Sequence, residues 1–108
     1  MAAGFGDMQS LLKQAQDMQR RMEETQRTLA ARTLEATSGG GAVTVCVNGN
    51  QELQSIKIDK AAVDPDDVEA LEDLVTVAVQ KALADAKQLR EQETAKVTGG
   101  MNLPGMGF

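Results

Sequence analysis

Basic side chains recur at a fixed interval in the N-terminal part of the chain. Lys13, Arg20 and Arg27 follow one another at seven-residue steps. Seven residues of α-helix make about two turns, or roughly 10.5 Å, so these side chains would form a row on one helix face. Such a row can follow a phosphate backbone. Charged residues are also ordinary at the outer positions of a coiled-coil-like helix, and Asp17 and Glu23 flank the row, so both interpretations stay open.

The composition excludes most catalytic chemistry. The 108 residues include no histidine, which removes imidazole acid–base catalysis, histidine-ligated zinc and a histidine pH switch. Cys46 is the only cysteine, so one chain can form neither an internal disulfide nor a cysteine metal cage. We expect Cys46 to be a small buried strand residue. We expect no enzymatic activity, no cofactor, no metal and no small-molecule substrate.

Two further motifs have structural roles and do not form ligand-binding sites. Residues 39–41 are three glycines that precede a strand and lack the Lys-Ser/Thr of a phosphate-binding loop. An acidic run begins near Asp59, but the twelfth position of a calcium loop would be Ala70, or Val75 if the loop began at Asp64. The bidentate glutamate that such a loop requires is missing in both registers. These residues therefore predict a turn and a helix start.

Apolar residues on alternating three- and four-residue steps predict a first helix, from Asp7 to Ala31, with Asp7 as its cap. This heptad seam is soft, because much of it is methionine and alanine. The seam consists of Met8, Leu11, Ala15, Met18, Met22, Thr25 and Leu29.

Three short strands are predicted between residues 33 and 58. The middle strand has a period of two, since valines alternate with Thr44 and Cys46. Asn48-Gly49 predicts a hairpin with a type I′ turn, in which both residues have positive φ. Leu53 is out of phase with Ile56 and Ile58 on the return strand, so we expect a bulge there.

A second helix is predicted over residues 64–97. Asp64 is its expected N-cap, Pro65 its first helical residue and Gly99-Gly100 its stop, followed by a flexible tail over 98–108. Its apolar stripe consists of Leu71, Leu74, Val75, Ala78, Ala82, Ala86 and Leu89.

The net charge of −5 is concentrated in one segment. Residues 59–73 contain seven acids and one lysine, whereas residues 1–38 contain five acids and five bases. Screening over about 8 Å at physiological salt separates the two regions electrostatically. The overall charge therefore does not exclude a nucleic-acid partner for the first helix.

The elements predict one α+β domain over residues 1–108 that needs a second copy. Two helices longer than a three-stranded sheet is wide must project from it, and their apolar seams then require partners. The chain also has only two aromatic residues with which to build a core. No run of about 20 apolar residues and no signal peptide is visible, so we expect a soluble cytoplasmic homodimer without membrane contact.

The ordered set of motifs resembles the YbaB/EbfC family of bacterial nucleoid-associated proteins. The resemblance extends over essentially the whole chain. Its motifs are residues 12–19, Gly39 to Val45, Asn48-Gly49, Ile56 to Asp59, Leu71 to Val79 and Thr98 to Pro104.

The resemblance implies an α-β-β-β-α protomer with long projecting N- and C-terminal helices around a small antiparallel sheet, in a tweezer-like homodimer. It also implies binding of double-stranded DNA in the nucleoid, to organise the chromosome and influence gene expression. The implied DNA-binding residues are Lys13, Arg20, Arg21, Arg27, Lys87, Arg90 and Lys96. The apolar periodicity itself predicts the seam between subunits or within the core, at Met8, Leu11, Met18, Met22, Leu71, Leu74 and Val75. An alternative stays open, a protein–protein adaptor that docks partner helices on its Met- and Ala-lined helices without binding DNA.

Overall fold

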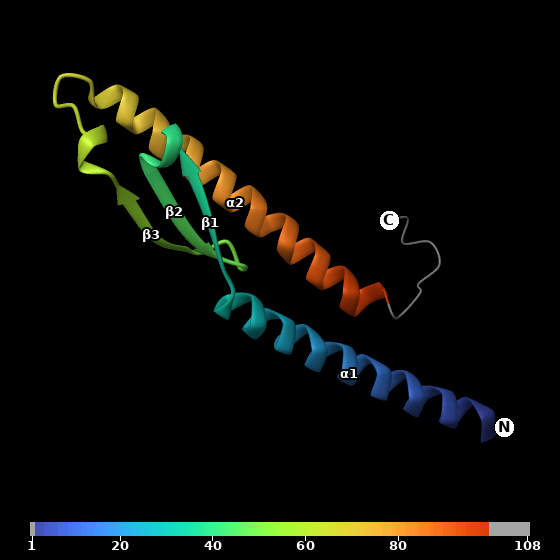
Figure 1. The fold of residues 1–108 in the computed structure, drawn as a ribbon. Helices are drawn as coiled ribbons and strands as arrows, with labels where there is room; N and C mark the ends of the chain where they lie inside the picture. Colours follow the sequence, from blue (N-terminus) through green and yellow to red (C-terminus); the bar gives the residue numbers. More distant parts are fainter. Residues whose placement is uncertain (1, 100–108) are drawn as a thin grey trace.

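The computed structural model describes residues 2–99, with side chains from Asp7 onward, and confirms the predicted order of elements (Figure 1). Short 3₁₀ turns follow the first and third strands, at Gly39–Gly41 and Lys60–Ala62. The elements are α1 (Ala2–Ala31), β1 (Thr33–Ser38), β2 (Val43–Asn48), β3 (Leu53–Ile58) and α2 (Val68–Gly99).

The three strands form an antiparallel sheet in the order β1-β2-β3, and α2 packs on one of its faces. Val43, Val45 and Val47 of β2 point toward α2 and are fully buried. The residues between them, Thr44 and Cys46, lie on the opposite face and are half-buried. The period-two pattern of β2 therefore selects the face that α2 covers.

Small residues let α2 lie close to the sheet. Ala78, Ala82 and Ala86 recur every four residues along the contact and are each 0% exposed. Leu71, Leu74 and Val75, from the predicted seam, are half-buried and pack against the same core. Because α2 lies mainly over β1 and β2, the third strand is left largely uncovered (Figure 1).

The predicted bulge at the start of β3 is confirmed. Cys46 pairs with Ser55 and Val47 pairs with Leu53, so Gln54 is the extra residue on β3. This bulge brings the Leu53 side chain into phase with the isoleucines that follow it.

The type I′ turn predicted at Asn48-Gly49 is wrong. The amide of Gln51 donates to the carbonyl of Asn48, and Gln51 has a φ of 63°, whereas Gly49 is outside the positive-φ set. This arrangement is a turn followed by a left-handed residue and closes a longer loop. The prediction treated Asn48 as a turn residue, but Asn48 belongs to β2 and its amide pairs with the carbonyl of Glu52.

Both predicted helix starts require correction. Helix α2 begins at Val68, four residues after the predicted start, and the Oδ1 atom of Asp67 accepts from the amide of Ala70. Asp64 instead closes a turn, in which its Oδ1 accepts from the amide of Asp66 and Pro65 occupies the position that favours a fixed φ. Three aspartates within four residues, Asp64, Asp66 and Asp67, offered several caps, and the one next to the apolar stripe is used.

Helix α1 begins at Ala2, so Asp7 lies inside the helix and is not its cap. Glycine costs only about 1 kcal/mol per residue in a helix, which does not prevent a long helix from continuing. Helix α2 also extends through Thr98 and Gly99, which were assigned to the tail; the rest of that segment, residues 100–108, lies outside the described residues.

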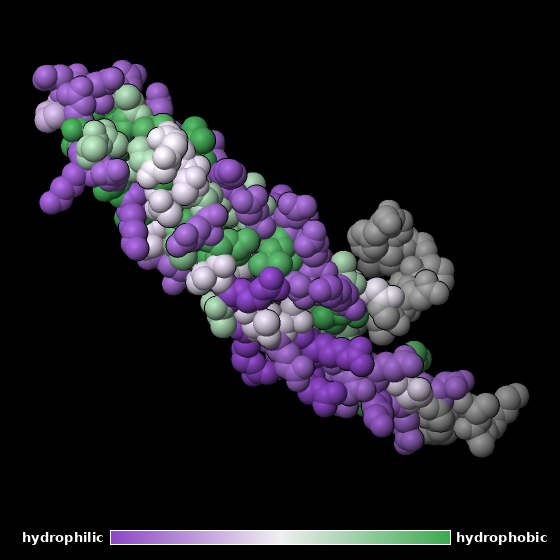
Figure 2. All heavy atoms as spheres, viewed as in Figure 1, coloured by the Kyte–Doolittle hydropathy of each residue, from purple (hydrophilic) through white to green (hydrophobic). Residues whose placement is uncertain are grey.

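The two helices make the molecule long. Its extents are 79 × 26 × 16 Å and its radius of gyration is 21.1 Å, against about 13 Å for a compact chain of this size. Helix α1 projects from the sheet at one end, while the acidic loop between β3 and α2 lies at the other (Figure 1). On the face drawn in Figure 2, apolar residues gather over the sheet and α2, whereas the projecting part of α1 is mostly hydrophilic. None of the described helices is long and apolar enough to cross a bilayer.

Candidate nucleic-acid interface

Helix α1 is held only at its C-terminal end, which we call the root of the arm. Leu29 is 1% exposed there, and it is the only residue of α1, among those with described side chains, that is fully buried. Toward the N-terminus the seam becomes progressively exposed, from the half-buried Met22 and Met18 to Leu11 at 64% and Met8 at 69%. The seam is therefore a core element at the root and a bare stripe along the arm.

Backbone hydrogen bonds fix the root to the hairpin loop. The amide of Gly49 donates to the carbonyls of both Leu29 and Arg32, at 2.9 Å each. Asn48 is 4% exposed, and its Nδ2 donates to the carbonyl of Ala30 at 3.3 Å, while Nδ2 of Asn50 donates to the carbonyl of Gln26 at 3.1 Å. The loop thus donates hydrogen bonds to carbonyls of the last two turns of α1 and of Arg32, which follows it.

An ionic cluster joins the same root to α2. Oε1 of Glu93 lies 3.3 Å from Nη1 of Arg32 and 3.1 Å from Nζ of Lys96. The hydrogen bond from Lys96 lowers the pKa of the Glu93 carboxyl below its ordinary value, and the charge of Arg32 lowers it further. Sequence periodicity gave no sign of these contacts, because Arg32 and Glu93 are 61 residues apart.

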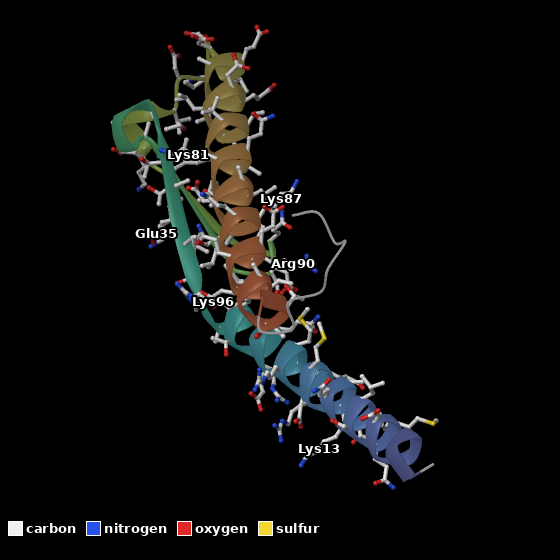
Figure 3. The ribbon with its side chains drawn as sticks, turned by 90° about the vertical axis from the view of Figure 1, so that its right-hand side faces the viewer. Lys13, Glu35, Lys81, Lys87, Arg90 and Lys96 are labelled. Atoms are coloured by element: carbon white, nitrogen blue, oxygen red, sulfur yellow. The ribbon has the colours of Figure 1, made fainter. Side chains whose placement is uncertain are left out.

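The predicted basic row lies on the arm and points to solvent. Lys13, Arg20 and Arg27 are all exposed, and they belong to the side of α1 opposite its seam. Arg20 lies 3.5 Å from Asp17, with the two side chains 65% and 45% exposed. Such an exposed pair contributes little and is readily exchanged for another anion. Figure 3 shows Lys13 directed away from the body of the molecule.

Arg21 does not belong to this row. It lines an open groove of about 290 Å³ between the root of α1 and the last turns of α2. Glu24, Glu93 and Lys96 line the same groove, so charges of both signs meet there. The mixture makes the groove a poor site for a polyanion.

The predicted cations of α2 are divided between two flanks of that helix. Figure 3 shows Lys87 and Arg90 on one flank and Lys96 on the other. Lys87 and Arg90 are exposed, and among the described residues neither has an ion pair within 4 Å, whereas Lys96 is paired with Glu93. The structure therefore does not bring the seven predicted cations into one surface.

The acidic residues lie far from the arm. The segment from Asp59 to Asp73 contains the loop between β3 and α2 and the first turns of α2, at the end of the molecule opposite α1 (Figure 1). Several of its carboxylates serve as local caps, including Asp59 for Ala61 and Asp67 for Ala70. Over residues 7–99, no group of three or more Cys, Asp or Glu side chains is arranged to hold a metal ion.

Comparison with known proteins agrees with this architecture. The model of the YbaB/EbfC DNA-binding family matches residues 4–101. The chain belongs to this family. Relatives of this chain include nucleoid-associated proteins from three bacteria. The one from Alkaliphilus metalliredigens is 48% identical over 103 residues, which cover 95% of this chain and 90% of the relative.

The relative from Clostridium kluyveri is 50% identical over 103 residues, covering 95% of this chain and 90% of that protein. The relative from Moorella thermoacetica is 50% identical over 102 residues, covering 94% of this chain and 98% of that protein. A crystal structure of an uncharacterized protein from Helicobacter pylori shares the fold, with a TM-score of 0.63 at 23% identity, covering 72% of this chain and 90% of that one. The predicted YbaB/EbfC resemblance and α+β fold are thus confirmed.

Proposed function

We propose that this protein binds duplex DNA through phosphate contacts made by the outer face of α1, and that it organises the chromosome in this way. The observation that carries the proposal is the row of Lys13, Arg20 and Arg27, exposed along an arm that projects clear of the sheet. Membership of a DNA-binding family, whose relatives are named nucleoid-associated proteins, supports it. Effects on gene expression would follow from occupancy of the chromosome.

The charge distribution is compatible with DNA binding by the arm, because the acidic segment lies far from it. The acids of residues 59–73 lie at the opposite end of a molecule that is 79 Å long. That separation is several times the screening length of about 8 Å at physiological salt. The acidic end therefore repels phosphates locally without weakening the contacts of the arm.

Arg21 and the α2 cations have secondary roles in this proposal. Lys87 and Arg90 form a second exposed pair on α2, in a position to contact the same duplex from another side. Lys96 borders the mixed-charge groove and pairs with Glu93, so we assign it mainly to the junction of the two helices. Arg21 is exposed at the edge of the same groove and has only a secondary role in DNA binding.

The binding unit is proposed to be a homodimer that forms along β3. This strand is an edge of the sheet, and all six of its residues are exposed. Ile56 pairs with Val45 and Ile58 pairs with Val43, so both isoleucines lie on the face that α2 covers elsewhere. They remain 40% and 41% exposed, beside Leu53 at 51%. An apolar strip with unpaired backbone groups is an unstable surface for a monomer, and a second copy covers it.

A gel shift with random duplex DNA at several salt concentrations tests the proposal. If two arms neutralise about six phosphates, the logarithm of the binding constant falls with the logarithm of salt with a slope near −5. Binding that does not depend on salt would contradict a phosphate-based interface. We expect the protein to be in the cytoplasm and on the nucleoid, which fluorescence microscopy of the tagged protein checks.

The bare seam of the arm favours the adaptor as a second candidate function. Met8 and Leu11 are more than 60% exposed, which is typical of a helix that docks against another protein. Absence of any gel shift at low salt, together with a folded dimer, would favour this candidate over DNA binding.

A further inference from the structure

The projecting part of α1 has an apolar stripe that needs an occupant. Met8, Leu11 and Leu12 are 69%, 64% and 61% exposed. The DNA-binding row lies on the other side of the helix, so it does not explain the stripe. Large apolar side chains in a continuous strip on a soluble arm indicate a contact with another helix.

Leu12 is the residue that the heptad pattern alone does not explain. With Met8 at position a, Leu11 is at d and Leu12 is at e, beside the seam and not in it. Arg21 occupies a g position, which flanks the seam on the other side. In paired helices, e and g residues contact the partner and decide orientation and register.

We propose that the arms of two copies of this chain pair antiparallel over residues 7–21. Layers of a against d then place Met8 against Met18 of the second copy, and Leu11 against its Ala15. The twofold axis falls near residue 13, so Leu12 meets Leu12 of the second copy. Asp7 lies beside Arg21 of the second copy, and symmetry repeats this ion pair.

Charge selects this register over its neighbours. A shift by one heptad in one direction places Arg21 beside Gln14, and a further heptad places Arg21 beside Arg21. A parallel pair brings the g position of Asp7 near Leu12 and that of Arg21 near Gln26, so it forms no flanking ion pair. Among heptad-related registers, only the proposed one pairs opposite charges and buries Leu12.

The paired segment is short, so a single pair of arms binds weakly and several pairs must act together. An overlap of a few heptad layers buries less than the roughly 1,200 Å² of a standard stable interface. Two arms on each homodimer, held at high local concentration on DNA, raise its effective strength. Lys13, Arg20 and Arg27 stay on the outer faces of the paired helices, so each pair of arms presents a basic row on two sides. Such a pair can hold two DNA segments together.

Disulfide trapping without DNA tests the contact. In a Cys46→Ser background, Leu12→Cys is expected to form an intermolecular disulfide at least tenfold faster than Ser10→Cys, under the same mild oxidant. Ser10 is also exposed on the arm, but its c position points away from the partner. Circular dichroism confirms that both variants are folded. Equal rates at the two positions would overturn the proposal. Equal rates are the result expected if the stripe binds something other than a second arm.

Charge reversal then tests the register. Asp7→Arg or Arg21→Asp, added to the Leu12→Cys chain, places like charges together twice in each pair and slows trapping by roughly tenfold. The double reversal restores the ion pairs with opposite polarity, so the rate returns toward that of the parent. Failure of the double variant to recover would overturn the antiparallel register. Because the rates are measured without DNA, a failure here is distinct from a failure of DNA binding.

Discussion

Gly49 lies against the backbone of Leu29 so closely that no larger residue fits. A Cβ atom at Gly49 would be 2.8 Å from the carbonyl oxygen of Leu29 and 2.8 Å from its Cδ2 atom. At the same place the Gly49 amide donates to that carbonyl. Glycine is therefore required by close approach and not by a positive φ. The root of the α1 arm depends on this contact.

Gly49→Ala is expected to destabilise the fold by about 2 kcal/mol or more, because the backbone oxygen cannot move aside without loss of the root hydrogen bonds. Urea unfolding at fixed protein concentration measures the change. Gly99→Ala is the matched control, since it meets nothing within 4 Å and lies at the end of α2. The control should be neutral or slightly stabilising. Similar losses in both variants would contradict the close-approach argument.

Replacing Lys13, Arg20 and Arg27 together by glutamine is expected to weaken DNA binding by about two orders of magnitude. The slope of log binding constant against log salt should also become shallower. The control changes Lys60 and Lys81 to glutamine, which removes positive charge from exposed positions outside both the arm and β3. An equal loss in the control would show that net charge matters and that the arm does not. The mass in solution should be unchanged in both.

Ile56→Glu combined with Ile58→Glu is expected to convert the proposed homodimer to a monomer of 11.5 kDa, because two carboxylates would have to be buried in the interface. Light scattering after gel filtration measures the mass. Val77→Glu serves as the control, since Val77 is 53% exposed on α2 and away from β3. If the double variant keeps the mass of the parent, the homodimer forms elsewhere.

Glu93→Gln is expected to lower the thermal midpoint near neutral pH, since Arg32 and Lys96 then lose their carboxylate partner. The folded state lowers the pKa of Glu93 from its ordinary value of 4.5. The stabilisation is therefore present above that value and is lost as the pH falls through the lowered pKa. Melting curves of both proteins should differ at neutral pH and converge in acid. A difference that persists in acid would assign the effect to packing.

Local patterns of the sequence predicted the elements, while contacts between distant residues escaped them. The alternation of Val43, Val45 and Val47 identified the buried face of β2, and Leu53 signalled the bulge. Asn48-Gly49 located the hairpin correctly, but the predicted reason, positive φ in a type I′ turn, was wrong. Glycine is needed at position 49 because the backbone of Leu29 lies so close to it. The three aspartates that could cap the start of α2 could not be ranked without knowing where the sheet lies.

The basic row of the candidate site could be predicted from the sequence, whereas the contacts between α1 and α2 beside it could not. Seven-residue spacing placed Lys13, Arg20 and Arg27 on one face, because helical geometry needs only local order. Lys87 and Lys96 are nine residues apart, about two and a half turns of α-helix, so their positions on opposite flanks of α2 also follow from local geometry. The ion pair of Arg32 with Glu93 depends on where α1 meets α2, which periodicity does not encode.

The single anchorage of α1 has a mechanical consequence. About 24 residues between the start of the helix and its root form a stiff rod of roughly 36 Å. A rotation of about 10° at the root therefore moves the far end of such a rod through roughly 6 Å. This is nearly twice the rise of about 3.4 Å between successive phosphates of one DNA strand. The loop of Asn48 and Gly49 is thus the pivot of α1. Small changes in its hydrogen-bond geometry produce larger displacements at the far end of the helix. In the DNA binding that we propose, this pivot would let the protein match duplexes of different curvature without changing its fold.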